Sequence, residues 1–110
     1  MLKNLDVKIK RFYARAMTTA DDFTQLGLTE WQVSGDTAEA SYECGSFTAG
    51  GALVARIAAI ADSQNHHPDV SLGYPGVVKV TTSSHDAGAL TDRDLTLARA
   101  IHDAAAESAA

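Results

Sequence analysis

Three of the four histidines lie within twenty residues of one another and are flanked by polar side chains. His66 and His67 follow each other in the segment 62–69, and His85 stands between Ser84 and Asp86. Imidazole exchanges protons near neutral pH, so two imidazoles that face one small molecule can act as general acid and general base. Asp62 precedes His66 by one helical turn, and its carboxylate is placed to hold an imidazole in one tautomer. These residue types predict acid/base chemistry but do not name a reaction.

Other interpretations of the same histidines stay open at this stage. His66 and His67 are also consistent with solvated loop residues that carry no chemistry. A zinc site is a further alternative, in which His85 or Asp62 supplies the third ligand. The fourth histidine, His102, is expected to be solvated or to cap the last helix.

The composition excludes several classes of protein. The chain has 110 residues, a formal net charge of -5 and a single cysteine, Cys44. The acidic balance argues against a nucleic-acid partner, which needs a basic face. One cysteine excludes an internal disulfide and a zinc site built from several thiolates, and it favours a reducing, cytoplasmic setting. No apolar run reaches the length of about 18 residues that a membrane span needs.

The first 17 residues differ in charge from the rest of the chain. Residues 1–17 carry a net charge of +4, which leaves -9 for the remainder. Apolar residues at spacings of three and four predict a basic amphipathic helix here. We interpret this extension as an element that binds a protein partner or a membrane surface, as an organelle-targeting segment, or else as a frayed or loosely docked extension. A single domain is expected over residues 18–110.

The remaining pattern predicts the order helix, two strands, helix, two strands, helix. Alternation of apolar and polar residues over 37–47 is typical of a strand with one buried face. The spacing of apolar residues over 48–64 is typical of an amphipathic helix. Thr91 and Asp94 sit three apart, as in a weak capping box at the start of the last helix. The expected elements are a helix from Thr19 to near Gly27, strands Trp31–Ser34, Thr37–Phe47, Val70–Tyr74 and Val77–Ser84, and helices Thr48–Gln64 and Thr91–Ala105.

The simplest assembly of these elements is an α+β, two-layer fold. It has a four-stranded antiparallel sheet with three helices packed on one face. The paired histidines then follow the end of a helix, and His85 follows the end of the last strand. Loops at the ends of rigid elements are where sites collect.

The motifs around the histidines also form a family pattern. The sequence resembles the pterin-4a-carbinolamine dehydratase family over roughly residues 19–106. The paired histidines before proline, the later histidine and the Leu-Thr-x-x-Asp opening of the last helix are the most specific part of the resemblance. The matching residues are Trp31, Phe47, 65–69, Tyr74, Val77, Val80, Ser84, His85, 90–94, Leu97, Ala98 and Ile101.

The resemblance implies an enzyme that removes water from 4a-hydroxytetrahydropterin and gives a quinonoid dihydropterin for recycling. It implies no metal and no organic cofactor, and it implies assembly into homodimers or homotetramers through the sheets. Carried over residue by residue, His66, His67 and His85 match the active-site histidines. Asp62 matches an acidic position beside them, Trp31 an aromatic near the pterin, and Asp94 an acid in the last helix.

The resemblance leads to a division of roles and to one alternative. We expect His66 and His85 to transfer the two protons and His67 to orient the substrate. Two of these residues have structural alternatives. Trp31 is also consistent with an anchor of the hydrophobic core, and Asp94 with a helix cap. Val70 stands where a large aromatic is common in the family, which would loosen the pocket. The alternative function is that of a non-catalytic relative, a dimerisation or assembly partner of another protein.

Overall fold

The computed structural model describes residues 18–84 and 87–109 of the chain. The predicted basic helix in residues 1–17, and His85 with Asp86, lie outside the described residues. The elements follow the predicted order. They are α2 (Ala20–Gln25), β1 (Gln32–Ser34), β2 (Thr37–Glu43), α3 (Phe47–Gln64), β3 (Asp69–Gly73), β4 (Val77–Thr82) and α4 (Asp92–Ala109).

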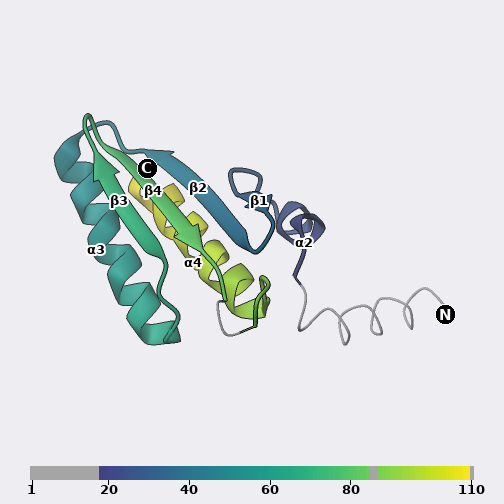
Figure 1. Ribbon diagram of the computed structural model, residues 1–110. Coiled ribbons are helices and arrows are strands. Elements are labelled where there is room, and N and C mark those ends of the chain that lie inside the picture. Colours follow the sequence, from purple (N-terminus) through teal and green to yellow (C-terminus); the bar gives the residue numbers. More distant parts are fainter. Residues whose placement is uncertain (1–17, 85–86, 110) are drawn as a thin grey trace, which may run out of the picture.

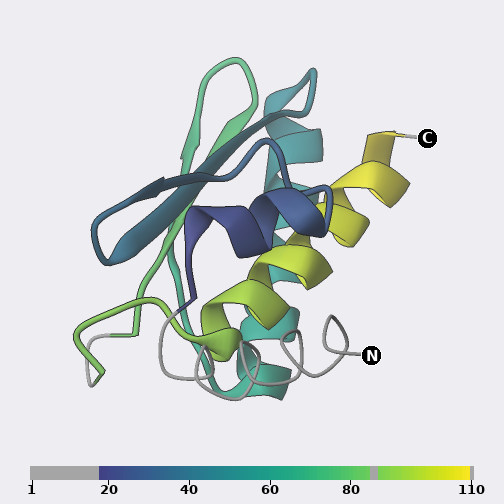
Figure 2. The same ribbon diagram turned by 90° about the vertical axis from the view of Figure 1, so that its right-hand side faces the viewer.

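The four strands form one antiparallel sheet in the order β1-β2-β4-β3. Tyr42 of β2 lies opposite Val78 of β4, and Val80 of β4 lies opposite Val70 of β3. The helices lie on one face of this sheet, with α3 and α4 packed side by side along it (Figures 1 and 2). The predicted α+β, two-layer fold is therefore confirmed.

The core lies between the sheet and the helices. Alternate residues of β2 and β4 point into it, and Ala38, Ala40, Val78 and Val80 are buried. The helices contribute one apolar stripe each, as their spacing predicts. These stripes include Leu53, Ile57, Leu97, Ala98 and Ile101. No helix among residues 18–84 and 87–109 combines the length and the apolar character that crossing a bilayer requires.

Two element boundaries differ from the sequence prediction by four residues each, and several others by one or two. Strand β2 ends at Glu43 rather than at Phe47, which is instead the first residue of α3. Gly45 has a φ of 87°, which breaks the strand, and the side chain of Ser46 caps the helix by accepting from the N–H of Ala49. The last helix continues to Ala109, and Arg56 of α3 contacts this part of it by donating to the carbonyl of Ala104 and pairing with Glu107.

Glycine is required in the turn between β3 and β4. Gly76 has a φ of 154°, and a Cβ added there would meet the backbone of Ser46. The change Gly76→Ala is expected to lower the free energy of unfolding by about 2 kcal/mol, because backbone atoms cannot yield as a flexible side chain can. Urea denaturation measures this, with Gly73→Ala as control because nothing lies within 4 Å of its added Cβ. Equal losses in the two variants would contradict the prediction.

Candidate active site

The site begins where α3 ends. Asn65 adopts a left-handed conformation with a φ of 51°, which asparagine tolerates better than most residues. The N–H of His66 then donates to the carbonyl of Ala61 at 3.1 Å, which closes the last turn of the helix. This reversal turns the side chain of His66 into the protein, while that of His67 stays on the surface.

His66 is bound inside the protein by the carboxylate of Asp94. Nε2 of His66 lies 2.7 Å from Oδ1 of Asp94, with side-chain exposures of 8% and 0%. The hydroxyl of Thr82 donates to the same oxygen at 2.6 Å. The hydroxyl of Ser84 and the backbone N–H of Thr91 donate to Oδ2 at 2.7 and 3.0 Å. Four donors therefore satisfy one buried carboxylate.

These four hydrogen bonds keep the carboxyl group of Asp94 ionised. Burial raises the pKa of its carboxyl, but hydrogen bonds from His66, Thr82, Ser84 and the backbone of Thr91 outweigh burial and bring the pKa below its usual range. The ionised carboxylate can only accept hydrogen bonds, so Nε2 of His66 carries a hydrogen. The imidazole is thus fixed both in orientation and at one ring nitrogen.

Asp94 caps the last helix and also binds His66. Its Oδ2 accepts from the N–H of Thr91, as the capping-box spacing predicts, while its Oδ1 binds His66. Sequence reasoning missed Thr82 and Ser84 as donors to this carboxylate. The signal for them is weak. Two hydroxyl residues stand two positions apart at the end of β4, where one strand face is buried.

A second pair lies on the surface at the same end of α3. Nε2 of His67 is 2.9 Å from Oδ1 of Asp62, with side-chain exposures of 59% and 78%. The expected contact of Asp62 with His66 was wrong. The helix ends before His66, and the left-handed residue Asn65 redirects the chain so that His67 comes to Asp62 instead. A carboxylate that accepts from Nε2 leaves Nδ1 of His67 as the ring nitrogen available to a ligand.

The other predicted residues are placed differently. Trp31 is 5% exposed and belongs to the hydrophobic core, where its ring lies 6.3 Å from that of Phe23. This burial favours the core-anchor interpretation. The side chain of His102 is 37% exposed, in keeping with the expectation of a solvated residue, but it also has a partner that was not expected, since its Nδ1 lies 2.7 Å from Oε2 of Glu30. Among the described residues, no group of three or more His, Cys, Asp and Glu side chains is arranged to hold a metal ion.

A shallow hollow of about 320 Å³ lies between the end of α3 and the start of α4, lined by Gln64, Asp92, Arg93 and Thr96. Arg93 joins these two helix ends, because its Nη2 donates to the carbonyl of Asn65 at 2.9 Å. The two histidines at 66 and 67 do not line this hollow. A cavity shared with His85 stays a prediction, since His85 lies outside the described residues.

Comparison with known proteins decides the family. The family model for pterin 4 alpha carbinolamine dehydratase matches residues 15–104. The chain belongs to this family. Within the pterin dehydratase family, it is similar to a Nocardia farcinica protein named "Putative pterin-4-alpha-carbinolamine dehydratase". The two are 42% identical over 71% of this chain and 81% of that protein. A Thermomicrobium roseum protein of the same name is 34% identical over 81% of this chain and 99% of its own length.

Solved structures share the pterin dehydratase fold. A transcriptional coactivator/pterin dehydratase from Brucella melitensis superposes with a TM-score of 0.69 and 25% identity, over 81% of this chain and 98% of that chain. A pterin dehydratase-like protein described as a RuBisCO assembly factor of the alpha-carboxysome superposes with a TM-score of 0.57 at 18% identity, over 68% and 86% of the two chains. The second likeness bears on the fold alone.

Proposed function

We propose that the protein dehydrates 4a-hydroxytetrahydropterins, with the exposed imidazole of His67 as a proton-transfer group. The observation that carries this proposal is the contact between His67 and Asp62, which leaves the other ring nitrogen of this accessible side chain without a partner among residues 18–84 and 87–109. Membership of the pterin dehydratase family supports the substrate class. The same membership supports the predicted homodimer or homotetramer, which stays part of the proposal.

The reaction needs one proton delivered and one removed. The C4a–O bond breaks, and the leaving hydroxyl takes a proton from a general acid and departs as water. The N5–H proton passes to a general base, and the electrons of that bond form the C4a=N5 double bond of the quinonoid dihydropterin. The elimination of water is redox-neutral and needs no oxidant or reductant. Imidazoles therefore suffice as proton donor and proton acceptor. Proton transfers of this kind contribute about 10²- to 10⁴-fold each.

The geometry favours a division of roles that differs from the expectation drawn from the sequence. His66 is almost completely buried and bound by Asp94, so it has little surface to offer a substrate. We assign it the role of a positioning residue that fixes the loop carrying its neighbour. His67 is exposed and has a carboxylate partner, and it takes the role of acid or base. His85 is the proposed second proton-transfer group on the grounds of the family motif.

The direct test of this function is a stopped-flow assay with freshly made 4a-hydroxytetrahydrobiopterin. The wild-type protein is expected to accelerate loss of the carbinolamine in proportion to protein concentration, and the rate should saturate with substrate. A folded protein that leaves the spontaneous rate unchanged would overturn the proposal. It would favour the alternative function as a protein partner, a role in keeping with the description of the similar Brucella melitensis protein as a transcriptional coactivator.

The carboxylate of Asp62 gives a second, smaller prediction. The change Asp62→Asn is expected to lower kcat by only about two- to fivefold, because an exposed ion pair is worth at most about 1 kcal/mol. The ring ¹⁵N signals of His67 should report a mixture of tautomers in the variant, since an amide accepts less strongly than a carboxylate. Asp103→Asn, at an exposed position of α4, is the control. Unchanged ¹⁵N signals of His67 in the Asp62 variant would show that the pair does not form in solution.

A further inference from the structure

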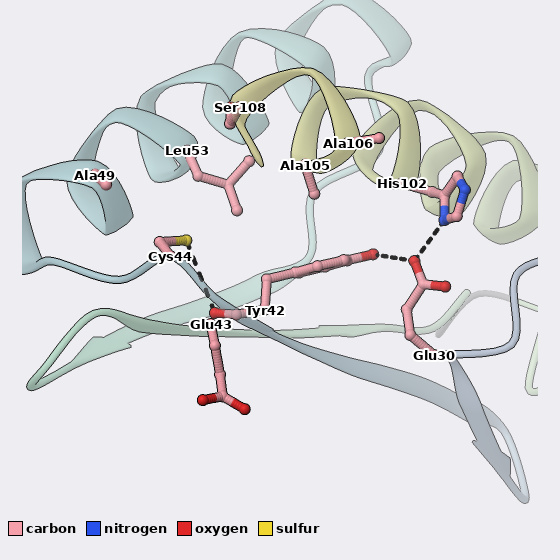
Figure 3. A pocket seen from close by; sticks show the side chains of 10 residues that line it. All are labelled: Glu30, Tyr42, Glu43, Cys44, Ala49, Leu53, His102, Ala105, Ala106 and Ser108. Atoms are coloured by element: carbon pink, nitrogen blue, oxygen red, sulfur yellow. Dashed lines mark hydrogen bonds and ion pairs between the residues drawn. The ribbon is translucent and has the colours of Figure 1, made fainter. Parts of the chain in front are cut away.

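A second hollow lies away from His66 and His67, toward the start of α3 and the end of α4. Its volume is about 300 Å³, and it sits between the last residues of β2 and the adjoining ends of α3 and α4 (Figure 3). Ala49 and His66 are 17 positions apart along and just beyond α3, so the hollow is on the order of 20 Å from the proposed active site. Its lining residues are Glu30, Tyr42, Glu43, Cys44, Ala49, Leu53, His102, Ala105, Ala106 and Ser108.

Small side chains leave this space unfilled. Ala105 of α4 points toward Tyr42 of β2 across the gap, and Ala49 of α3 lies on the helix side of the hollow, opposite Cys44, which follows β2 (Figure 3). Protein interiors are otherwise packed as densely as organic crystals. A mainly apolar hollow of this size, with a few polar groups at one end, has the form of a pocket for a small molecule. Its volume lies at the lower end of the range for ligand pockets, which fits a ligand with a single ring.

The polar end of the hollow is formed by three linked side chains. The hydroxyl of Tyr42 donates to Oε2 of Glu30 at 2.8 Å, and Nδ1 of His102 lies 2.7 Å from the same oxygen. Burial raises the pKa of Glu30, but the hydrogen bonds from His102 and Tyr42 outweigh it and bring the pKa below its usual range. Burial, with the bond to Glu30, raises the pKa of Tyr42 far above its ordinary value. The group is therefore a carboxylate held by a neutral phenol and an imidazole N–H.

The hydrogen-bonding groups at the hollow favour a ligand that donates. Tyr42 and His102 already donate to Glu30. The thiol of Cys44 points to the carbonyl of Tyr42 at 3.8 Å, and the hydroxyl of Ser108 donates to the carbonyl of Ala104 at 3.0 Å. The side-chain hydrogens of Tyr42, Cys44 and Ser108 are thus in use, whereas an oxygen lone pair on Tyr42, whose phenol also interacts with Trp31, and those on Ser108 can still accept. The nearby carboxylate of Glu30 further favours a cation over an anion.

We propose that this hollow binds a small primary amine with an apolar ring. The ring lies between Leu53 and the small side chains of the two helices, and the ammonium group donates to the phenol oxygen of Tyr42 beside Glu30. The carboxylate of Glu43 takes no part, because its side chain points away from the hollow (Figure 3). This inference is independent of the proposed dehydration.

The test compares three probes of equal size that differ in one group. We expect 2-phenylethylamine to bind, as measured by calorimetry and by shifts of the amide signals of Tyr42, Leu53 and Ala105. The alcohol 2-phenylethanol should bind about tenfold more weakly, because it lacks the positive charge. Phenylacetate should not bind. Equal binding of amine and phenylacetate, or no binding of the amine at millimolar concentration, would overturn the proposal.

Two variants separate the hollow from the rest of the protein. Ala105→Leu fills the space and is expected to abolish amine binding, while Ala58→Leu at an exposed position of α3 leaves it intact. Glu30→Gln should weaken the amine about tenfold and leave the alcohol unchanged. Thermal unfolding checks the fold of each variant, and the Ala105 variant should keep the dehydration rate. If Ala105→Leu instead dissociates an oligomer, the hollow is a subunit interface and the proposal is wrong.

Discussion

Replacing His67 by glutamine is expected to lower kcat for dehydration of the carbinolamine by about 10²- to 10⁴-fold. Glutamine keeps a similar size and can still bond to Asp62, but it cannot take up or release a proton near neutral pH. Since His67 is exposed and contributes nothing to the core, the free energy of unfolding should stay within about 0.5 kcal/mol of the wild type. Stopped-flow kinetics with correction for the spontaneous reaction measures the first effect, and urea denaturation the second.

The control for this variant is Arg99→Gln, which removes an exposed charged side chain on α4. It should match the wild type in both rate and stability. The change His66→Gln tests the role assigned to His66. Because a positioning residue acts through the loop, this change should affect the free energy of unfolding and KM together. A full rate in the His67 variant, with a large loss confined to the His66 variant, would reinstate the division of roles first expected from the sequence.

The change Asp94→Asn is expected to lower the free energy of unfolding by about 3 kcal/mol at neutral pH. The carboxylate accepts four hydrogen bonds in a fully buried position, and an amide presents an NH₂ group to donors that need an acceptor. Asp103→Asn, on the exposed side of the same helix, should change stability by less than about 0.5 kcal/mol. Urea denaturation of the two variants beside the wild type provides the comparison.

The same pair of proteins gives the sign of the pH dependence. The pKa of Asp94 is lower in the folded protein than in the unfolded chain, so its ionisation stabilises the fold above the unfolded value of about 3.9. This contribution is lost as pH falls through the folded pKa. The part of the stability gap between wild type and Asp94→Asn that comes from the ionised carboxylate should therefore shrink below about pH 4. The pKa of Glu30 is also lowered in the folded protein, but its contribution is the same in both proteins and cancels from the difference in their free energies of unfolding. A gap that widens in acid would contradict the account.

The fold was predictable because its signals are local. Alternation over 37–43 and helical spacing in the segments that became α3 and α4 give the layers directly. The capping role of Asp94 was also visible, since Thr91 and Asp94 are three residues apart. The end of β2 was misplaced because Phe47 suits a strand. The glycine at 45 and the Ser46 cap set the boundary there.

The contacts of the site were less predictable because they join distant residues or depend on one backbone angle. His66 and Asp94 are 28 positions apart, and Glu30 and His102 are 72 positions apart. Local sequence patterns do not predict contacts between residues so far apart in the chain. The exchange of partners between His66 and His67 follows from the left-handed conformation of Asn65. If the helix is assumed to continue through Asn65, Asp62 is paired with His66, whereas in the structure it contacts His67.

The central claim is that Nδ1 of His67 faces the substrate while His66 stays bound to Asp94. Ring ¹⁵N NMR tests it most directly, with titration by 7,8-dihydrobiopterin, a pterin without the 4a-hydroxyl that cannot dehydrate. We expect the Nδ1 signal of His67 to move with pterin concentration, while the Nε2–H of His66 keeps its bond to the carboxylate. An unmoved His67 signal at saturating pterin, or loss of the His66 bond on binding, would contradict it.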